Sequence, residues 1–151
     1  MATPTYDLLA STTLTSSSTS ITFASIDQSY GDLILVVNVG AAVMRLNGDT
    51  GYYYPAVGMF GNGSTAASAV LNNTHFNSYY TSLPNGMSKF QIMDYSATDK
   101  HKSVLFEYSQ GAVAIERYAG RFTRTAAITS LEIGIYTYPI GSTFNLYGVA
   151  K

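Results

Sequence analysis

The sequence has 151 residues but no cysteine and no tryptophan, and only 11% of its residues are charged. Without cysteine the chain has no disulfide framework, no thiolate metal ligand and no cysteine nucleophile. Its charged fraction is less than half of the roughly 25% that is typical of soluble domains. With a formal net charge of -1 and no basic cluster, the composition argues against nucleic acid or an anionic membrane as a partner.

Long hydrophobic runs are also absent. No apolar run approaches the ~18 residues of a transmembrane helix, and the first residues lack the basic start and apolar core of a secretory signal. The most apolar stretch, residues 33–43, contains Asn38 and Gly40. We interpret it as a strand, either buried on both faces or central in a sheet beneath a second sheet. We therefore expect a soluble protein with one domain over residues 1–151, which is long enough to bury a sizeable core.

Uncharged polar groups have to cover most of the surface. Serine, threonine, asparagine, glycine and the 13 tyrosines are the material left for this purpose. Because charge repulsion contributes to keeping proteins monomeric and soluble, a surface with so little charge favours association. We infer from the composition that partner proteins occupy much of the surface.

Alternation of apolar and polar residues predicts strands along most of the chain, with no convincing helix. The predicted strands cover residues 5–11, 20–24, 33–39, 89–95, 103–109, 130–138 and 143–148, with one or two more between residues 113 and 122. The Ser/Thr-rich tract between the first two is interpreted as an exposed β-rich segment in preference to a flexible linker. The pattern predicts an all-β protein, a single jelly-roll-like β-sandwich of about 8-10 strands.

The last 27 residues carry the clearest pattern. The apolar residues that share a face are Leu131, Ile133 and Ile135 in one strand and Phe144 and Leu146 in the next. Pro139 and Gly141 interrupt the run, as turn residues do. The sequence therefore predicts a terminal β-hairpin.

The middle of the chain is less regular. Glycines punctuate residues 44–68, which predicts a hairpin or long loops, and residues 72–85 show no clear periodicity. Residues 94–102 form a predicted solvated turn that carries Asp99, Lys100 and Lys102.

Candidate catalytic and metal-binding motifs are weak. The triplet at residues 49–51 is Asp-Thr-Gly, as in retroviral-type aspartic proteases, but it follows Asn-Gly and runs into three tyrosines, so a polar β-turn is the better explanation. His75 and His101 have no second ligand at metal spacing and are expected at the surface.

Other enzyme signatures are missing as well. Residues 61–64, Gly-Asn-Gly-Ser, lack the lysine and the helix of a phosphate-binding loop, and no serine lies in a nucleophile elbow. Nine acidic residues without tryptophan give little support for glycoside hydrolysis. We predict that the protein is not an enzyme and that it needs no cofactor and no metal.

Tyrosines provide the remaining functional signal. The candidate contact residues are Tyr52, Tyr53, Tyr54, Tyr79 and Tyr80, all in segments rich in glycine and asparagine. Tyrosine offers a large contact area at small entropic cost, so such segments suit protein or glycan binding. Packing of the same rings beneath long loops is the alternative, and the sequence leaves both open.

Several blocks of the sequence share features with a known family: residues 45–54 (RLNGDTGYYY) with 61–64 (GNGS), 92–102 (IMDYSATDKHK), 124–130 (RTAAITS) with 141–148 (GSTFNLYG), and the early segments 14–23 (LTSSSTSITF) and 30–33 (YGDL). These blocks resemble virion proteins of tailed bacteriophages, especially phages of cyanobacteria and other marine bacteria. The resemblance covers nearly the whole chain. It departs at residues 120–123, where a tryptophan-containing segment is common.

The resemblance implies a place on the exterior of a virion and no catalytic residues. Two roles follow: a capsid decoration or cement protein that binds the major capsid protein, or a tail-fibre or receptor-binding module that binds a host glycan. Strand-like sequence begins by Thr5, with no attachment region before it, and this favours decoration. The low charge and the exposed edges of a sandwich predict a homo-oligomer, with a trimer favoured.

Overall fold

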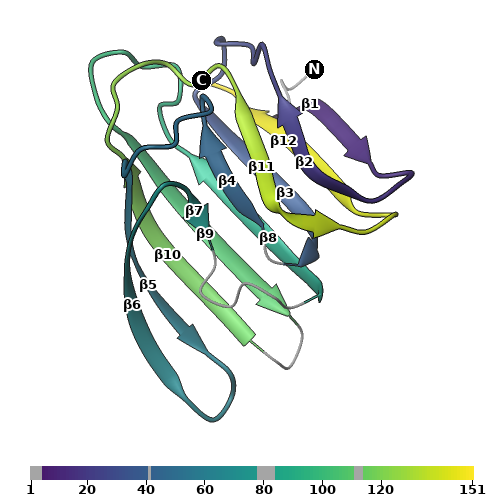
Figure 1. Ribbon diagram of the computed structural model, residues 1–151. Coiled ribbons are helices and arrows are strands. Elements are labelled where there is room, and N and C mark those ends of the chain that lie inside the picture. The colour runs from purple at the N-terminus through teal and green to yellow at the C-terminus, as the bar shows by residue number, and fades with distance from the viewer. Residues whose placement is uncertain (1–4, 41, 78–83, 111–113) are drawn as a thin grey trace.

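The computed structural model describes residues 5–40, 42–77, 84–110 and 114–151. These residues form twelve β-strands and no helix, and the strands make two antiparallel sheets packed face to face (Figure 1). The expected all-β sandwich is confirmed. Twelve strands exceed the eight to ten expected because residues 43–77 add four short or weakly patterned strands. Among the described residues, no helix could cross a membrane.

The larger sheet contains eight strands. Their order is β1 (Tyr6–Thr13), β12 (Thr143–Val149), β3 (Asp32–Gly40), β8 (Pro84–Ile92), β9 (Lys102–Gln110), β10 (Ala114–Phe122), β5 (Tyr54–Gly61) and β6 (Ala66–Asn73). The smaller sheet contains four strands in the order β2 (Ser18–Phe23), β11 (Leu131–Tyr138), β4 (Val43–Leu46) and β7 (Phe76–Asn77). The lower ends of β5, β6, β9 and β10 extend beyond the smaller sheet (Figure 1).

Strand pairing is nested around the middle of the chain. β1 pairs with β12, β2 with β11, β3 with β8, and β4 with β7, alternating between the two sheets. The two hairpins β5–β6 and β9–β10 stand outside this nesting and join each other through β5 and β10. They therefore widen the larger sheet by four strands beyond β8.

The predicted terminal hairpin is wrong. β11 and β12 lie in different sheets, so the connection Pro139–Ser142 crosses from one sheet to the other. Gly141 has a φ of 85°, its N–H donates to the Leu14 carbonyl (2.8 Å), and the Leu14 N–H donates to the Ser142 carbonyl (2.9 Å). The β11–β12 connection is thus bonded to the β1–β2 connection, which crosses the sandwich at the same end. Turn residues and an alternating pattern suit such a crossing as well as a hairpin.

Most predicted strand faces are confirmed. The central strand β3 buries Leu33, Leu35 and Val37 beneath the smaller sheet, and its other face is only half-buried. The second of the two interpretations of this stretch is therefore correct. The Ser/Thr-rich tract lies in β1, β2 and their connection, so the choice of a β-rich segment over a linker is also confirmed.

One hydrophobic core unites the two sheets. It includes Leu35, Val37, Phe144 and Leu146 from the larger sheet and Met44, Leu46, Leu131 and Ile133 from the smaller sheet, all 0–1% exposed. Complete burial of a Leu or Ile side chain contributes about 1.5–3 kcal/mol. The core is therefore the principal source of stability for the part of the fold that both sheets cover.

A row of aromatic rings extends this core along the inner face of the larger sheet. We call Phe90, Phe106 and Tyr118, which are cross-strand neighbours on β8, β9 and β10, the aromatic row. The Phe106 and Tyr118 rings stack at 4.6 Å with an interplanar angle of 7°, and Phe90 stacks on Phe106 at 5.6 Å. The row ends at Gly58, the cross-strand partner of Tyr118, where a Cβ would lie 2.1 Å from the tyrosine ring.

Lys102 departs from the predicted solvated turn. Its side chain is fully buried at the start of β9, and its ammonium donates to the carbonyls of Lys100 (2.9 Å) and Thr125 (2.8 Å). Burial lowers the pKa of this ammonium, an effect that nearby Asp99 and Asp94 oppose. The lysine therefore fastens the 123–127 segment to the turn before β9, a role that its charge alone does not reveal.

We predict that Gly58→Ala destabilises the protein by about 1–3 kcal/mol, because the added methyl group displaces the Tyr118 ring from the aromatic row. The Tyr118 hydroxyl donates to buried Glu116 at 2.8 Å, so the ring is held at both ends. Gly61→Ala in the same strand is the matched control, since its Cβ would have its nearest contact at 3.5 Å. Urea denaturation of both variants measures the difference, and equal midpoints would contradict the prediction.

Candidate functional site

The three consecutive tyrosines predicted as a contact surface have three different environments. Tyr52 is 72% exposed, Tyr53 is half-buried and Tyr54 is completely buried. Tyr79 and Tyr80 lie outside the described residues. The interior alternative is therefore correct for Tyr54, which cannot form part of a contact surface, while Tyr52 is placed as a contact residue would be.

Tyr54 is fixed in the core at the start of β5. Its ring packs edge-on against Phe76 and at a tilt against Phe122, each at 5.0 Å. Its hydroxyl donates to the Asp49 carbonyl (2.8 Å) and accepts from the Leu46 N–H (3.1 Å). Burial raises the pKa of Tyr54 to about 12. The residue is an anchor for the loop at 47–53, which connects β4 to β5.

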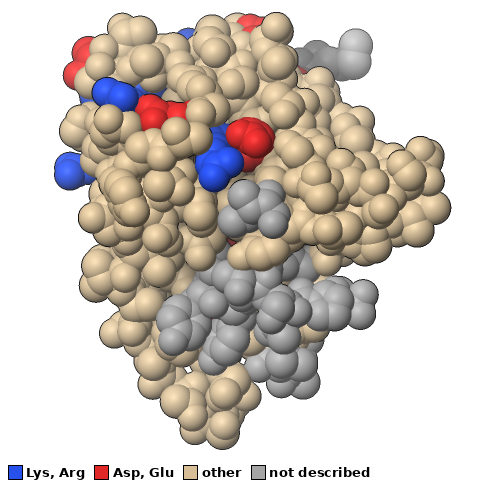
Figure 2. Space-filling view, in the orientation of Figure 1, with Lys and Arg blue, Asp and Glu red and all other residues tan. Residues whose placement is uncertain are grey.

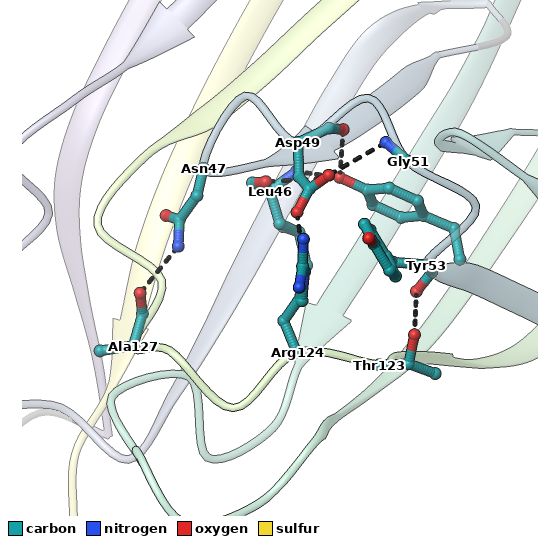
Figure 3. Close-up of polar contacts among 9 residues, drawn as sticks. Leu46, Asn47, Asp49, Gly51, Tyr53, Thr123, Arg124 and Ala127 are labelled. Carbon is teal, nitrogen blue, oxygen red and sulfur yellow. Dashed lines mark hydrogen bonds and ion pairs between the residues drawn. The ribbon is translucent and has the colours of Figure 1, made fainter.

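A tight turn opens this loop. Asn47 and Gly48 both have positive φ values, 54° and 65°, and the Asp49 N–H donates to the Leu46 carbonyl at 3.0 Å. Asn-Gly is the preferred pair for such a turn. The Asn47 amide donates to the Ala127 carbonyl (2.8 Å), as Figure 3 shows, and its oxygen accepts from the Thr129 N–H (2.8 Å). The turn is thereby bonded to the 123–130 segment.

Asp49 and Arg124 complete the connection between the two segments. The Asp49 carboxylate accepts from the Gly51 N–H (3.0 Å) and from Arg124 Nε (3.1 Å), and the Tyr53 carbonyl accepts from Thr123 Oγ1 (3.4 Å) (Figure 3). The Arg124 guanidinium also lies 3.8 Å from the centroid of the Tyr53 ring. The prediction of a polar turn at the Asp-Thr-Gly triplet is confirmed, because its carboxylate bonds to a turn amide and an arginine.

These residues line a shallow depression of about 320 Å³. Asn47, Asp49, Phe122 and Arg124 lie on its walls, with Thr125 and Ala126. Asn47 uses both its amide nitrogen and its oxygen, and Asp49 uses both carboxylate oxygens, in bonds within the protein. The polar groups of the depression therefore serve mainly to join the loops. Arg124, whose side chain is 49% exposed, is the polar group of the depression that a ligand can reach most easily, and exposed Tyr52 lies in the same loop as Asp49.

The other candidate motifs also have structural partners. Asn62 Oδ1 in the β5–β6 turn accepts from the backbone N–H groups of Ser64 (3.1 Å) and Thr65 (2.8 Å). His101 is exposed, as expected, but His75 is half-buried beside Thr74, and burial lowers its pKa. Within the described ranges, no three His, Asp or Glu side chains are grouped so that they could hold a metal ion.

The outer face of the larger sheet carries a second candidate surface, which the sequence analysis missed. We define the outer apolar patch as six exposed side chains on five adjacent strands: Met87, Leu105, Ile115, Val57, Met59 and Val70. Val70 is 79% exposed and Met59 is 70% exposed. Five of the six side chains alternate with buried residues along their strands, and Val70 is the cross-strand partner of Val57, which is one of those five. All six therefore point away from the core.

Cross-strand register makes the patch continuous. Leu105 is paired with Ala119, Ala119 with Val57, and Val57 with Val70, giving an uncharged row across β9, β10, β5 and β6. The row on one side contains three charged side chains that bind one another: Glu107 pairs with Lys89 (2.9 Å) and Arg117 (3.0 Å). The row on the other side contains exposed Arg121, the cross-strand partner of Ser103. Such exposed apolar groups on one face are typical of protein-contact surfaces. Alternation in residues 103–109 was visible in the sequence, but the pairing that assembles the patch was not.

Comparison of the chain with protein-family models and with curated proteins found no match.

We predict that Tyr54→Phe destabilises the protein by about 1–3 kcal/mol, because it leaves the part-buried Asp49 carbonyl and the buried Leu46 N–H without their shared partner. Tyr52→Phe removes the same hydroxyl from an exposed ring and should change the stability by less than about 0.5 kcal/mol. Chemical denaturation of the two variants provides the measurement. Similar losses in both would show that the hydroxyl of Tyr54 contributes nothing specific.

Alkaline pH provides a second prediction for Tyr54. Its pKa is raised from 10.0 to about 12 in the folded state, so its stabilising contribution is fully present below pH 10 and is lost as the pH rises through about 12. Tyr54→Phe should therefore lose less stability than the unmodified chain between pH 10 and 12. Denaturation curves across that range test this, and identical slopes would contradict it.

Proposed function

We propose that the protein is a non-enzymatic structural protein of a tailed-bacteriophage virion, and that it decorates the exterior of the capsid by binding the major capsid protein. The outer apolar patch is the observation that carries this proposal. The six exposed apolar side chains, with Lys89, Glu107 and Arg117 paired to one another and Arg121 at the border, can bury neutral area against a protein partner at little cost in desolvated charge. The resemblance of the sequence blocks to phage virion proteins supplies the identity of that partner.

The pairing of the strands is compatible with this proposal and with its alternative. With the β5–β6 and β9–β10 hairpins set aside, the remaining strands have the orders β1-β12-β3-β8 and β2-β11-β4-β7. We interpret this nested order as a jelly roll with two inserted hairpins. Jelly rolls occur in viral capsid proteins and in lectins, so this interpretation fits both capsid decoration and glycan binding. The fold does not distinguish these two roles, and the argument for one of them has to come from the surface of the protein.

The distribution of charge is consistent with a protein partner and argues against nucleic acid or a membrane. The net charge is -1. On the face drawn in Figure 2, the Lys, Arg, Asp and Glu side chains lie in the upper half, and the lower end, where the β5–β6 turn lies, carries none. The trimer predicted from the sequence stays a prediction, because the structure describes one chain.

A receptor-binding module of a tail fibre is the alternative. Tyr52 is exposed in the loop at 47–53, whose Asp49 lines the depression, and its ring offers a face on which a sugar can stack. Glycan sites combine such a ring with several polar groups directed at the ligand. Asn47 and Asp49 are already bonded within the protein, so the apolar patch supports decoration more strongly than the depression supports glycan binding.

We predict that Val57→Lys in the outer apolar patch weakens attachment to capsids by about tenfold or more, because the contact then buries an unpaired charge. Leu8→Lys is the matched control, since Leu8 and Val57 are each 57% exposed. Leu8 belongs to β1, which is the first strand in the order of the larger sheet, and Val57 belongs to β5, which is the seventh. Binding of the purified variants to particles that lack the protein measures the effect.

Copy number in purified virions tests the role itself. Hundreds of copies per particle are expected for a capsid decoration protein, and the protein should remain with tail-less capsids. A small number of copies that separate with the tail would favour the fibre alternative. Equal attachment of the Val57→Lys and Leu8→Lys variants would show that the outer apolar patch is not the contact.

A further inference from the structure

Strand β6 forms one edge of the larger sheet, at the left of Figure 1. Its eight residues pair with β5 in unbroken register from Ala66–Gly61 to Asn73–Tyr54. None of its residues is buried, and no other described strand pairs with its free side. β6 therefore presents a row of backbone N–H and C=O groups to solvent, which is a template for another strand.

The other sheet edges have features that hinder such pairing. The register of β1 with β12 shifts between Leu8 and Ala10, and the register of β2 with β11 shifts as well. The fourth edge, β7, has only two residues. Bulges and short length are common protections of natural sheet edges. Among the four edges formed by described strands, β6 alone is both long and regular.

Charge and proline, the other usual protections, are also missing from β6. Its sequence is AASAVLNN, and the chain has no Asp, Glu, Lys or Arg between Asp49 and Lys89. Its first four side chains are small, three Ala and one Ser, and of the last four Val70 and Asn72 are exposed while Leu71 and Asn73 are half-exposed. Neither steric bulk nor charge repulsion therefore opposes the approach of a second strand.

We propose that β6 pairs antiparallel with β6 of a second copy of this chain, joining two eight-stranded sheets edge to edge. A strand that pairs with itself has two-fold symmetry, so the contact consumes both free edges and closes. Pairing of β6 with β1 of another copy would instead leave an edge free at each end and would meet the bulge of β1. Because β6 carries no charge, self-pairing places no like charges opposite each other.

The contact has consequences for size and symmetry. One pair of eight-residue strands is smaller than a standard interface of ~1,600 Å², so we expect a dimer that dissociates on dilution. The two outer apolar patches become neighbours across the axis, since Val70 of each copy lies beside it. A two-fold contact through β6 predicts a dimer in solution and not the trimer expected from the sequence.

Sedimentation of the full chain over a range of concentrations tests the proposal. We expect a concentration-dependent dimer for the unmodified protein and a monomer for Val70→Lys, because the substitution places two like charges near the axis. Ser68→Lys should act in the same way without removing an apolar side chain. Val57→Lys is the matched control: Val57 is the cross-strand partner of Val70 on β5, one strand away from the edge, and this variant should still form the dimer.

Cross-linking provides a readout of geometry. Since the chain has no cysteine, Val70→Cys introduces a single thiol that a short bismaleimide should link between copies. Val57→Cys should not be linked, because two β5 strands lie three strand spacings apart, about 14 Å, across a β6–β6 contact. Circular dichroism and thermal melts verify that each variant remains folded, as expected at positions this exposed.

Four outcomes would overturn the proposal: a monomer at every concentration, a trimer, loss of the dimer in the Val57→Lys variant as well, or a dimer that survives both Val70→Lys and Ser68→Lys. Loss in all three variants would mean that the copies meet through the sheet face. The measurements need no virion, so failure here is distinguishable from failure of the capsid-binding proposal.

Discussion

Stacking of the aromatic row on the inner face of the larger sheet is the interaction on which the extended half of the molecule depends. The smaller sheet has four strands and the larger has eight, so the smaller sheet cannot bury the whole inner face of the larger one. Beyond the smaller sheet, aromatic rings bury one another. Phe106 is central among them, because its ring contacts Phe90, Tyr118 and, from the smaller sheet, Phe76. Such pairs add about 0.5–1.5 kcal/mol each beyond the area they bury. Gly58 on β5 leaves room for the Tyr118 ring because it has no Cβ, and the sheet continues from β5 to its edge at β6.

The loops at the other end of the hairpins are held by polar bonds. Asn47, Asp49, Arg124 and buried Lys102 join three segments that are far apart in the sequence. These side chains use their polar atoms in bonds within the protein. Their main role is therefore to hold the three segments together, and few polar groups remain for a ligand. The bonded loops and the apolar side chains on the outer face of the sheet are consistent with the proposed binding to a capsid shell.

A shortage of charge connects the proposed function with the proposed dimer. Natural sheets protect their faces and edges with charged side chains, and 39 residues of this chain, between Asp49 and Lys89, have none. All of β6 and four of the six side chains of the outer apolar patch belong to this uncharged segment. The patch is a face and the edge is a row of backbone groups, so the two surfaces can be occupied at the same time, one by a shell and one by a second copy.

The sequence by itself determined the fold class and most of the buried faces, because alternation with period 2 depends only on neighbouring residues: Leu131, Ile133, Phe144 and Leu146 are buried as predicted. Local patterns do not specify which strands pair. The chain from Leu131 to Val149 therefore suggested a hairpin where the structure has a crossing between sheets, and Tyr52, Tyr53 and Tyr54 could not be separated into surface, intermediate and core. Lys102 was likewise predicted as solvated, since nothing near it in the sequence reveals the Thr125 carbonyl that it binds. Only the tertiary structure decided which residues of β5, β6, β9 and β10 share a face and which strand is left at the edge, because both depend on contacts between distant segments.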